Sequence, residues 1–163
     1  MIKVGVISDT HIPFFSKTLP KNIEKYFQGV ELILHAGDLV DLGALNELKK
    51  LSKRVEAVCG NMDLPNVEAI LPKKKIITVG KYLIGLIHGW GPPKNLLKYV
   101  TEAFAKDSVD IIVFGHSHEP YNEEKEGILY FNPGSASDKS AKCENTIGIL
   151  ELNEVKRGKI IKL

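Results

Sequence analysis

The stretch "IKVGVISDTH", residues 2–11, is a short apolar run that stops abruptly at the polar residues Asp9, Thr10 and His11. Similar apolar runs at residues 30–36 and 54–60 predict two further strands. Between these runs, residues 18–27 and 41–51 place apolar side chains at helical spacing, so each segment predicts a helix with one face on a sheet. This alternation of strand and helix patterns indicates an α/β fold.

The second half of the chain is richer in strand patterns than in helix patterns. Residues 75–89 predict two strands joined by a turn at Gly80 and Lys81, and residues 92–107 predict a helix. Four further strands are expected at residues 109–115, 127–132, 146–153 and 158–163. Because a single open parallel sheet does not suit so many strands, we expect two packed β-sheets, a β-sandwich, flanked by helices. No repeat or linker divides the sequence, which predicts a single domain over residues 1–163.

Composition excludes several classes of protein. The 163 residues are 44% hydrophobic and 26% charged, as in ordinary globular domains. The net charge of +2 is far from that of a dedicated nucleic-acid binder. No apolar run reaches the roughly 18 residues of a membrane span, and the first residues do not resemble a secretory signal. We therefore expect a cytoplasmic protein with no membrane partner, in which Cys59 and Cys143 are reduced thiols.

Polar residues follow five of the predicted strands at the point where each strand ends. In α/β sheets, ligand sites form beyond the carboxyl ends of the strands. The chain places seven candidate metal ligands there, namely Asp9, His11, Asp38, Asn61, His88, His116 and His118.

Each of these residues also has an ordinary structural explanation. Asp9 could cap a turn, Asp38 and Asn61 follow glycines in typical turn pairs, and a His-x-His pair can simply end a strand. All of these explanations would have to hold together at five strand ends, which favours a functional site. In an extended chain His116 and His118 would lie on the same side, roughly 6.5 Å apart, a spacing that suits ligands of two neighbouring ions.

The residue types narrow the chemistry. Carboxylate, imidazole and amide oxygen together suit Mn²⁺, Fe²⁺, Co²⁺ or Zn²⁺ better than Mg²⁺ or Ca²⁺. With no thiolate among the ligands, the pattern indicates an open catalytic site rather than a structural one. A carboxylate such as Asp38 can bridge two ions about 3.5–4 Å apart, which polarise a phosphoryl oxygen and activate a water molecule.

The short motifs DTH, GD, GN, HG and GHSH occur between residues 9 and 118, in an order and spacing that resemble the calcineurin-like metallophosphoesterase superfamily. The motif NPGS at residues 132–135 resembles an element of its small prokaryotic phosphodiesterase branch. The resemblance implies a two-sheet sandwich flanked by helices. It also implies that one metal is held by Asp9, His11 and His118, that the other is held by Asn61, His88 and His116, and that Asp38 bridges the two.

The activity expected from this resemblance is the hydrolysis of a small phosphodiester by a hydroxide that two divalent ions activate. We expect Asp38, Asn61 and His116 to be catalytic, and Mn²⁺ to be the ion, with Ni²⁺, Co²⁺, Fe²⁺ and Zn²⁺ as alternatives. Other functions of the same fold stay open: a non-enzymatic scaffold or interaction module, a phosphomonoesterase or a nuclease. An oligomer is compatible with the sequence.

Two residues depart from the family pattern or lie outside it. Met62 stands where many members of the superfamily carry a proton-donating histidine, and Asp63 is the nearest titratable residue in the sequence. His35 has no ligand counterpart, so we expect a packed side chain or a contact behind the ligands. The motif NPGS receives no chemical role from the sequence.

Overall fold

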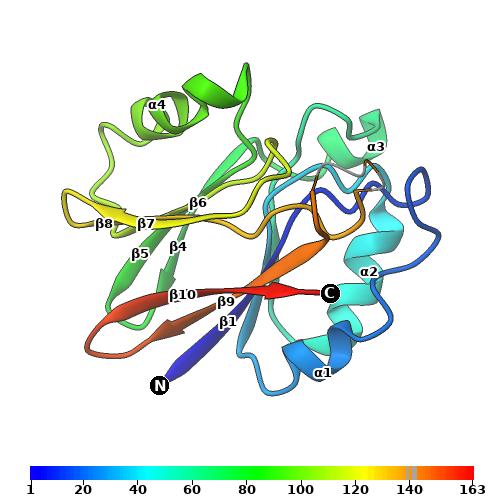
Figure 1. The fold of residues 1–163 in the computed structure, drawn as a ribbon, viewed down its shortest axis with the longest axis horizontal. Coiled ribbons are helices and arrows are strands. Elements are labelled where there is room, and N and C mark those ends of the chain that lie inside the picture. The colour runs from blue at the N-terminus through cyan, green and yellow to red at the C-terminus, as the bar shows by residue number, and fades with distance from the viewer. Residues whose placement is uncertain (139, 141–142) are drawn as a thin grey trace.

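The computed structural model describes residues 1–138, 140 and 143–163, and shows two five-stranded sheets packed face to face (Figure 1). The first sheet contains, in spatial order, β10 (Lys156–Lys162), β9 (Thr146–Leu152), β1 (Ile2–Ile7), β2 (Leu32–His35) and β3 (Val55–Ala57). The second contains β4 (Lys74–Val79), β5 (Tyr82–Ile87), β6 (Ile111–Val113), β8 (Ile128–Asn132) and β7 (Tyr121–Lys125). The two-sheet arrangement predicted from the excess of strands is therefore confirmed.

Each sheet combines parallel and antiparallel strands. In the first sheet β1, β2 and β3 are parallel, whereas β9 is antiparallel to both β1 and β10. In the second sheet β5, β6 and β8 are parallel, and the outer strands β4 and β7 run antiparallel to their neighbours. Parallel central strands place their carboxyl ends at the same edge of a sheet, where ligand sites form.

The main hydrophobic core lies between the two sheets. Val4 and Val6 of β1 pack in one cluster with Leu86 of β5 and Val113 of β6. The next residue along, Ile7, belongs to a second cluster on the outer face of the first sheet. This alternation follows from the two-residue period of a strand, and it buries both faces of the central strands.

The helices cover the outer faces of the sandwich. They are α1 (Ile23–Phe27), α2 (Leu42–Leu51), α3 (Pro65–Glu68) and α4 (Pro93–Ala103). α4 lies over the second sheet, and α1, α2 and α3 lie on the opposite side of the molecule (Figure 1). Phe27 of α1 and Leu48 of α2 pack on the first sheet, and Val100 of α4 packs on the second. Within the described residues, no helix has the length and apolarity needed to cross a membrane.

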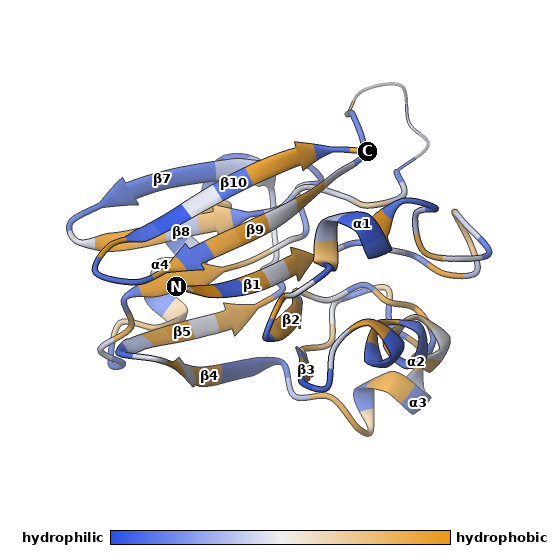
Figure 2. Ribbon diagram, turned by 90° about the horizontal axis from the view of Figure 1, so that it is seen from below, coloured by the Kyte–Doolittle hydropathy of each residue, from blue (hydrophilic) through white to orange (hydrophobic). Residues whose placement is uncertain are grey.

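Two elements were not predicted from the sequence. Strand β7 has the sequence YNEEK, pairs only with β8 at the edge of its sheet, and is largely hydrophilic (Figure 2). Polar side chains suit such an edge strand because its free side faces water. Helix α3 is a single turn, which is too short to show a helical period. The expected helix at 18–27 is also shorter in the structure, where it covers only Ile23–Phe27.

Candidate metal centre

Side chains from the turns after β1, β2, β5 and β6 converge on one buried point. Asp9 Oδ1 lies 3.3 Å from Nε2 of His118 and 3.9 Å from Nε2 of His88. Asp38 Oδ2 lies 3.3 Å from Nε2 of His88 and 3.8 Å from Nε2 of His11. The four innermost residues, Asp9, His11, Asp38 and His88, are at most 3% exposed. The structure thus brings together residues that are far apart in the sequence.

One part of this centre consists of Asp9, His11 and His118. The Nε2 atoms of the two histidines are 3.3 Å apart, and both face Asp9 Oδ1. Their ligand atoms all lie close enough together to hold a single metal ion. This trio matches the set that the family resemblance implied for the first metal.

A second part lies around Asp38 and His88. These two residues, with Asp9, form another group that could hold an ion. Asn61 and His116 stand next to it: Asn61 Oδ1 is 3.1 Å from Nδ1 of His116, and the His116 ring centroid is 5.3 Å from that of His88. All seven predicted residues therefore lie around one centre. Asp9, like Asp38, faces both parts of the centre, which the sequence did not predict.

The orientation of three histidines is fixed from behind. His88 Nδ1 donates to the Ala36 carbonyl oxygen at 2.7 Å, and His116 Nε2 donates to the Gly91 carbonyl oxygen at 2.9 Å. His118 Nδ1 donates to Asp138 Oδ2 at 2.6 Å. Because a carbonyl or carboxylate oxygen only accepts, His88 and His118 carry a proton on the outward nitrogen, and in the neutral ring their other nitrogen presents a lone pair to the centre. The sequence analysis missed Asp138.

Buried atoms without partners show that the centre needs positive charge. Asp9 Oδ1 and His88 Nε2 are both buried and have no hydrogen bond within the described part of the chain. An unpaired buried polar atom is costly, and here an oxygen and a nitrogen with lone pairs face each other. A divalent cation would satisfy both atoms. The carboxylate and imidazole ligands therefore fit the borderline divalent metals.

The protonation equilibria indicate the same need for positive charge. Burial lowers the pKa of His88, but the Asp38 carboxylate, 3.3 Å away, and the charge of Asp9 outweigh this effect and raise the pKa to about 9. The Asp9 carboxylate, 3.3 Å from Nε2 of His118, raises the pKa of that histidine to about 9 as well, against the effect of burial. Burial raises the pKa of the Asp9 carboxyl, but its interactions with His118 and His88 dominate and leave it below the ordinary value.

Most of the candidate ligands have a left-handed backbone. Positive φ angles occur at Asp9 (53°), His11 (44°), Asp38 (56°), His116 (72°) and His118 (61°). Such a conformation costs about 1–3 kcal/mol per non-glycine residue, and it persists only where the surroundings enforce it. Its concentration at five of the seven candidate ligands indicates that the turns are shaped for a function.

Two glycines allow the turns to approach each other closely. A Cβ atom on Gly60 would overlap Asp38 Oδ1 and would come within 2.6 Å of the Asp38 backbone nitrogen. A Cβ atom on Gly115 would overlap Ser8 Oγ and lie 2.7 Å from Asp9 Oδ2. The GN and GH motifs therefore need glycine for steric reasons, since any side chain there would displace a candidate ligand.

The loop that contains the NPGS motif, residues 132–138, ties two ligand turns together. Asn132 Nδ2 donates to the Gly115 carbonyl oxygen at 2.9 Å, on the turn that carries His116 and His118. Ser135 Oγ donates to the Asp9 carbonyl oxygen at 2.9 Å, on the turn after β1. The motif thus has a structural role, and the same loop carries the Asp138 carboxylate that contacts His118.

The structure also shows the surroundings of His35, Met62 and Asp63, which are not among the seven candidate ligands. His35 is fully buried; its Nδ1 accepts from the Gly37 amide at 3.2 Å, which confirms a packed residue behind the ligands. The Met62 side chain is 48% exposed, and its amide donates to Asp38 Oδ1 at 2.8 Å. Asp63 accepts hydrogen bonds from the amides of Gly60 and Val40, so its carboxylate holds the loop and does not face the centre.

The fold and the residues of the centre define an α/β sandwich with a candidate dinuclear metal site. The calcineurin-like phosphoesterase superfamily domain matches residues 2–155, and the chain belongs to this family. A probable metallophosphoesterase of Methanocaldococcus jannaschii is 42% identical over 135 residues, which cover 81% of this chain and 67% of that protein. A probable metallophosphoesterase of Methanothermobacter thermautotrophicus is 38% identical over 133 residues, which cover 81% of this chain and 76% of that protein.

Solved structures with the same fold include the following two. Vps29 from Entamoeba histolytica in complex with Zn²⁺ is 24% identical, with a TM-score of 0.76 over 99% of both chains. An archaeal phosphodiesterase is also 24% identical, with a TM-score of 0.75 over 98% of this chain and 100% of that one. At this identity, both likenesses concern the fold.

Proposed function

We propose that this protein is a divalent-metal-dependent phosphodiesterase. The observation that carries the proposal is the convergence of carboxylate, imidazole and amide groups from five turns on a centre whose buried Asp9 Oδ1 and His88 Nε2 lack partners within the described residues. Membership of the phosphoesterase family supports ester hydrolysis, and the archaeal phosphodiesterase of the same fold supports diesters as the substrate class.

In this proposal two ions share the centre. Asp9, His11 and His118 hold one ion, and Asn61, His88 and His116 hold the other. Asp38 bridges them, supported by the position of its Oδ2 atom, 3.8 Å from His11 Nε2 and 3.3 Å from His88 Nε2. When bound, such ions polarise a phosphoryl oxygen and lower the pKa of a water molecule.

The catalytic roles proposed for the chain's own residues are holding and orienting. Asp38 is kept in place by the Met62 amide at 2.8 Å. The amide oxygen of Asn61 faces His116, and Asn61 is exposed. The Nδ2 group of Asn61 is therefore available to donate to a phosphoryl oxygen. These residues include no proton donor for the leaving group. The Met62 thioether has no proton to donate, and the Asp63 carboxylate accepts hydrogen bonds from the Val40 and Gly60 amides.

We favour Mn²⁺ as the ion. Mixed oxygen and nitrogen ligands suit Mn²⁺, and the same set also suits Fe²⁺, Co²⁺, Ni²⁺ and Zn²⁺. The Zn²⁺ in the Entamoeba histolytica structure supports a divalent ion in this fold rather than one particular element. Assays with each ion in turn on metal-stripped protein distinguish these choices.

The test is hydrolysis of bis(4-nitrophenyl) phosphate with and without added Mn²⁺, in wild type and in Asp38→Asn. Activity should require the ion and disappear with a chelator. Losing a group behind a metal ligand costs about 10–100-fold, so losing the bridging ligand should cost more than about 100-fold. The matched control is Asp41→Asn, since Asp41 caps α2 through the Gly43 amide at 2.9 Å and asparagine caps as well as aspartate. Full activity in metal-stripped wild type, or in Asp38→Asn, contradicts the proposal.

The alternative function is a non-enzymatic interaction module. The fold likeness to Vps29 and the absence of a proton donor at Met62 favour it. A protein of this kind would bind divalent ions without hydrolysing monoesters, cyclic diesters or activated diesters. The same assay therefore separates the two functions.

A further inference from the structure

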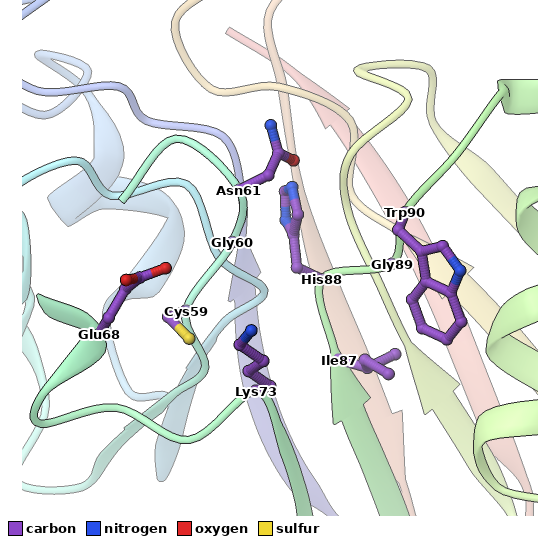
Figure 3. A pocket seen from close by; sticks show the side chains of 9 residues that line it. All are labelled: Cys59, Gly60, Asn61, Glu68, Lys73, Ile87, His88, Gly89 and Trp90. Atoms are coloured by element: carbon purple, nitrogen blue, oxygen red, sulfur yellow. The ribbon is translucent and has the colours of Figure 1, made fainter. Parts of the chain in front are cut away.

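A cleft of about 530 Å³ opens directly beside the candidate metal centre. His88 and Asn61 form the end of the cleft at the centre (Figure 3). Other walls come from residues to which the centre gives no role, among them Lys73, Ile87 and Trp90. Its volume lies within the range of about 300–1,000 Å³ that is usual for small-molecule sites.

One wall of the cleft is an aromatic platform. Trp90 is the only tryptophan of the sequence, is 48% exposed, and stacks on Tyr99 with the ring planes 3° apart and the centroids 5.7 Å apart. Gly91, at φ 78°, lets the chain pass close to Tyr99, because a Cβ atom there would lie 2.7 Å from the tyrosine ring. Stacking on Tyr99 occupies one face of the indole and holds it in place. The exposed remainder of the indole is therefore preorganised for a planar ligand.

The opposite wall carries two charged side chains that form no ion pair with a described residue. Glu68 and Lys73 lie across the cleft from Trp90 (Figure 3). Both residues are exposed, and neither forms an ion pair with a described residue. A carboxylate and an ammonium group together supply an acceptor and a donor, which is what the polar edge of a heterocycle requires.

We infer that this cleft is a subsite for an aromatic heterocycle attached to the substrate phosphate, such as the base of a nucleoside phosphodiester. The heterocycle stacks on Trp90 over the apolar Ile87, and its polar edge contacts Lys73 and Glu68. The phosphoryl group then lies at the end of the cleft formed by His88 and Asn61. This subsite rests on the proposed function, because it identifies the substituent that the phosphodiester carries.

The experiment titrates adenosine into the metal-loaded protein and follows Trp90 fluorescence, excited where the five tyrosines do not absorb. Zn²⁺ serves as the ion because it does not quench fluorescence. Adenosine has no phosphate and is not hydrolysed, so the signal reports binding alone. We expect saturable quenching by adenosine and none by ribose. In the double variant Glu68→Gln/Lys73→Met the affinity should fall at least about fivefold, whereas Lys25→Met, on α1, should bind like wild type.

A kinetic arm tests Trp90 itself. Stacking of a base on an aromatic side chain is worth about 1–3 kcal/mol, so Trp90→Leu should lower kcat/KM for a nucleoside phosphodiester by about 5- to 150-fold. The kcat/KM for a dialkyl phosphate should change little. No saturable quenching, equal quenching by ribose, or equal losses for both esters in Trp90→Leu would overturn the subsite. Quenching without hydrolysis of any ester would refute the phosphodiesterase and keep the subsite, whereas hydrolysis without quenching would do the reverse.

Discussion

Replacing Asp138 by alanine should weaken metal binding although Asp138 is not among the seven candidate ligands. The Asp138 carboxylate lies 2.6 Å from Nδ1 of His118, and its side chain is only 8% exposed. Its own backbone amide is held by Ser135 Oγ at 3.0 Å, so the carboxylate is fixed by the loop that also binds the Asp9 turn. Without it, the His118 ring loses the partner that fixes its orientation and keeps the Nε2 lone pair towards Asp9.

The expected magnitude follows from this geometry. Removing a hydrogen-bond partner behind a metal ligand costs about 10–100-fold in metal affinity, which corresponds to about 1.4–2.7 kcal/mol. Asp138→Asn should lose less than Asp138→Ala, because the amide oxygen can still accept from Nδ1. The loss should appear in the affinity for Mn²⁺ more than in the melting temperature of the metal-free protein.

The assay is a calorimetric titration of metal-free protein with Mn²⁺. The matched control is Asp110→Ala: Asp110 accepts from the Leu83 amide at 2.7 Å and lies just before β6, at the end opposite the candidate ligands. This variant should lose stability and keep its affinity for Mn²⁺. If Asp138→Ala binds Mn²⁺ as tightly as wild type, or if Asp110→Ala loses as much affinity, then the proposed role of Asp138 is wrong.

Three further predictions concern the neighbourhood of the centre and the surface. Met62→His should raise turnover of alkyl phosphodiesters more than that of nitrophenyl esters, because general acid catalysis contributes about 10²–10⁴-fold and matters most for poor leaving groups. Parallel plots of kcat/KM against leaving-group pKa for wild type and Met62→His would contradict this. Gly60→Ala should reduce the Mn²⁺ bound per chain, because its Cβ overlaps Asp38 Oδ1, and unchanged metal content by elemental analysis would show that the turn can move. Burial raises the pKa of the Glu56 carboxyl, but the contact with Lys75 dominates and leaves this pKa below its ordinary value. The stabilisation by Glu56 is therefore present at neutral pH and is lost as the pH falls from the ordinary carboxyl pKa through the lowered one. Urea unfolding should show that Glu56→Gln is destabilised at neutral pH and that the difference from wild type shrinks as the pH falls below the ordinary carboxyl pKa; a difference independent of pH would be the contrary result.

The sequence predicted the two-sheet fold because it contains more strand patterns than a single open parallel sheet flanked by helices can hold. It predicted seven candidate ligands because polar residues stand where the apolar strands end, and the structure places these residues around one centre. Strand β7 escaped prediction because its edge position needs no apolar pattern, and α3 because one turn has no period.

Contacts across the chain were harder to predict than the residues that make them. Asp138 is 20 residues from His118, and only the three-dimensional path of the loop after β8 brings the carboxylate to the ring. The nearest signal in the sequence was the NPGS motif a few residues earlier. Asp63 shows the converse: its carboxylate is adjacent to Met62 in the sequence but turns towards the Gly60 and Val40 amides.

The most direct test of the two-ion centre is the number of Mn²⁺ ions bound per chain, measured by equilibrium dialysis and elemental analysis on wild type, His88→Ala and His118→Ala. The proposed ligand sets predict two ions in wild type, with the second site lost in His88→Ala and the first weakened in His118→Ala. A wild type that binds no Mn²⁺, or variants that each still bind two ions with unchanged affinity, would contradict the account.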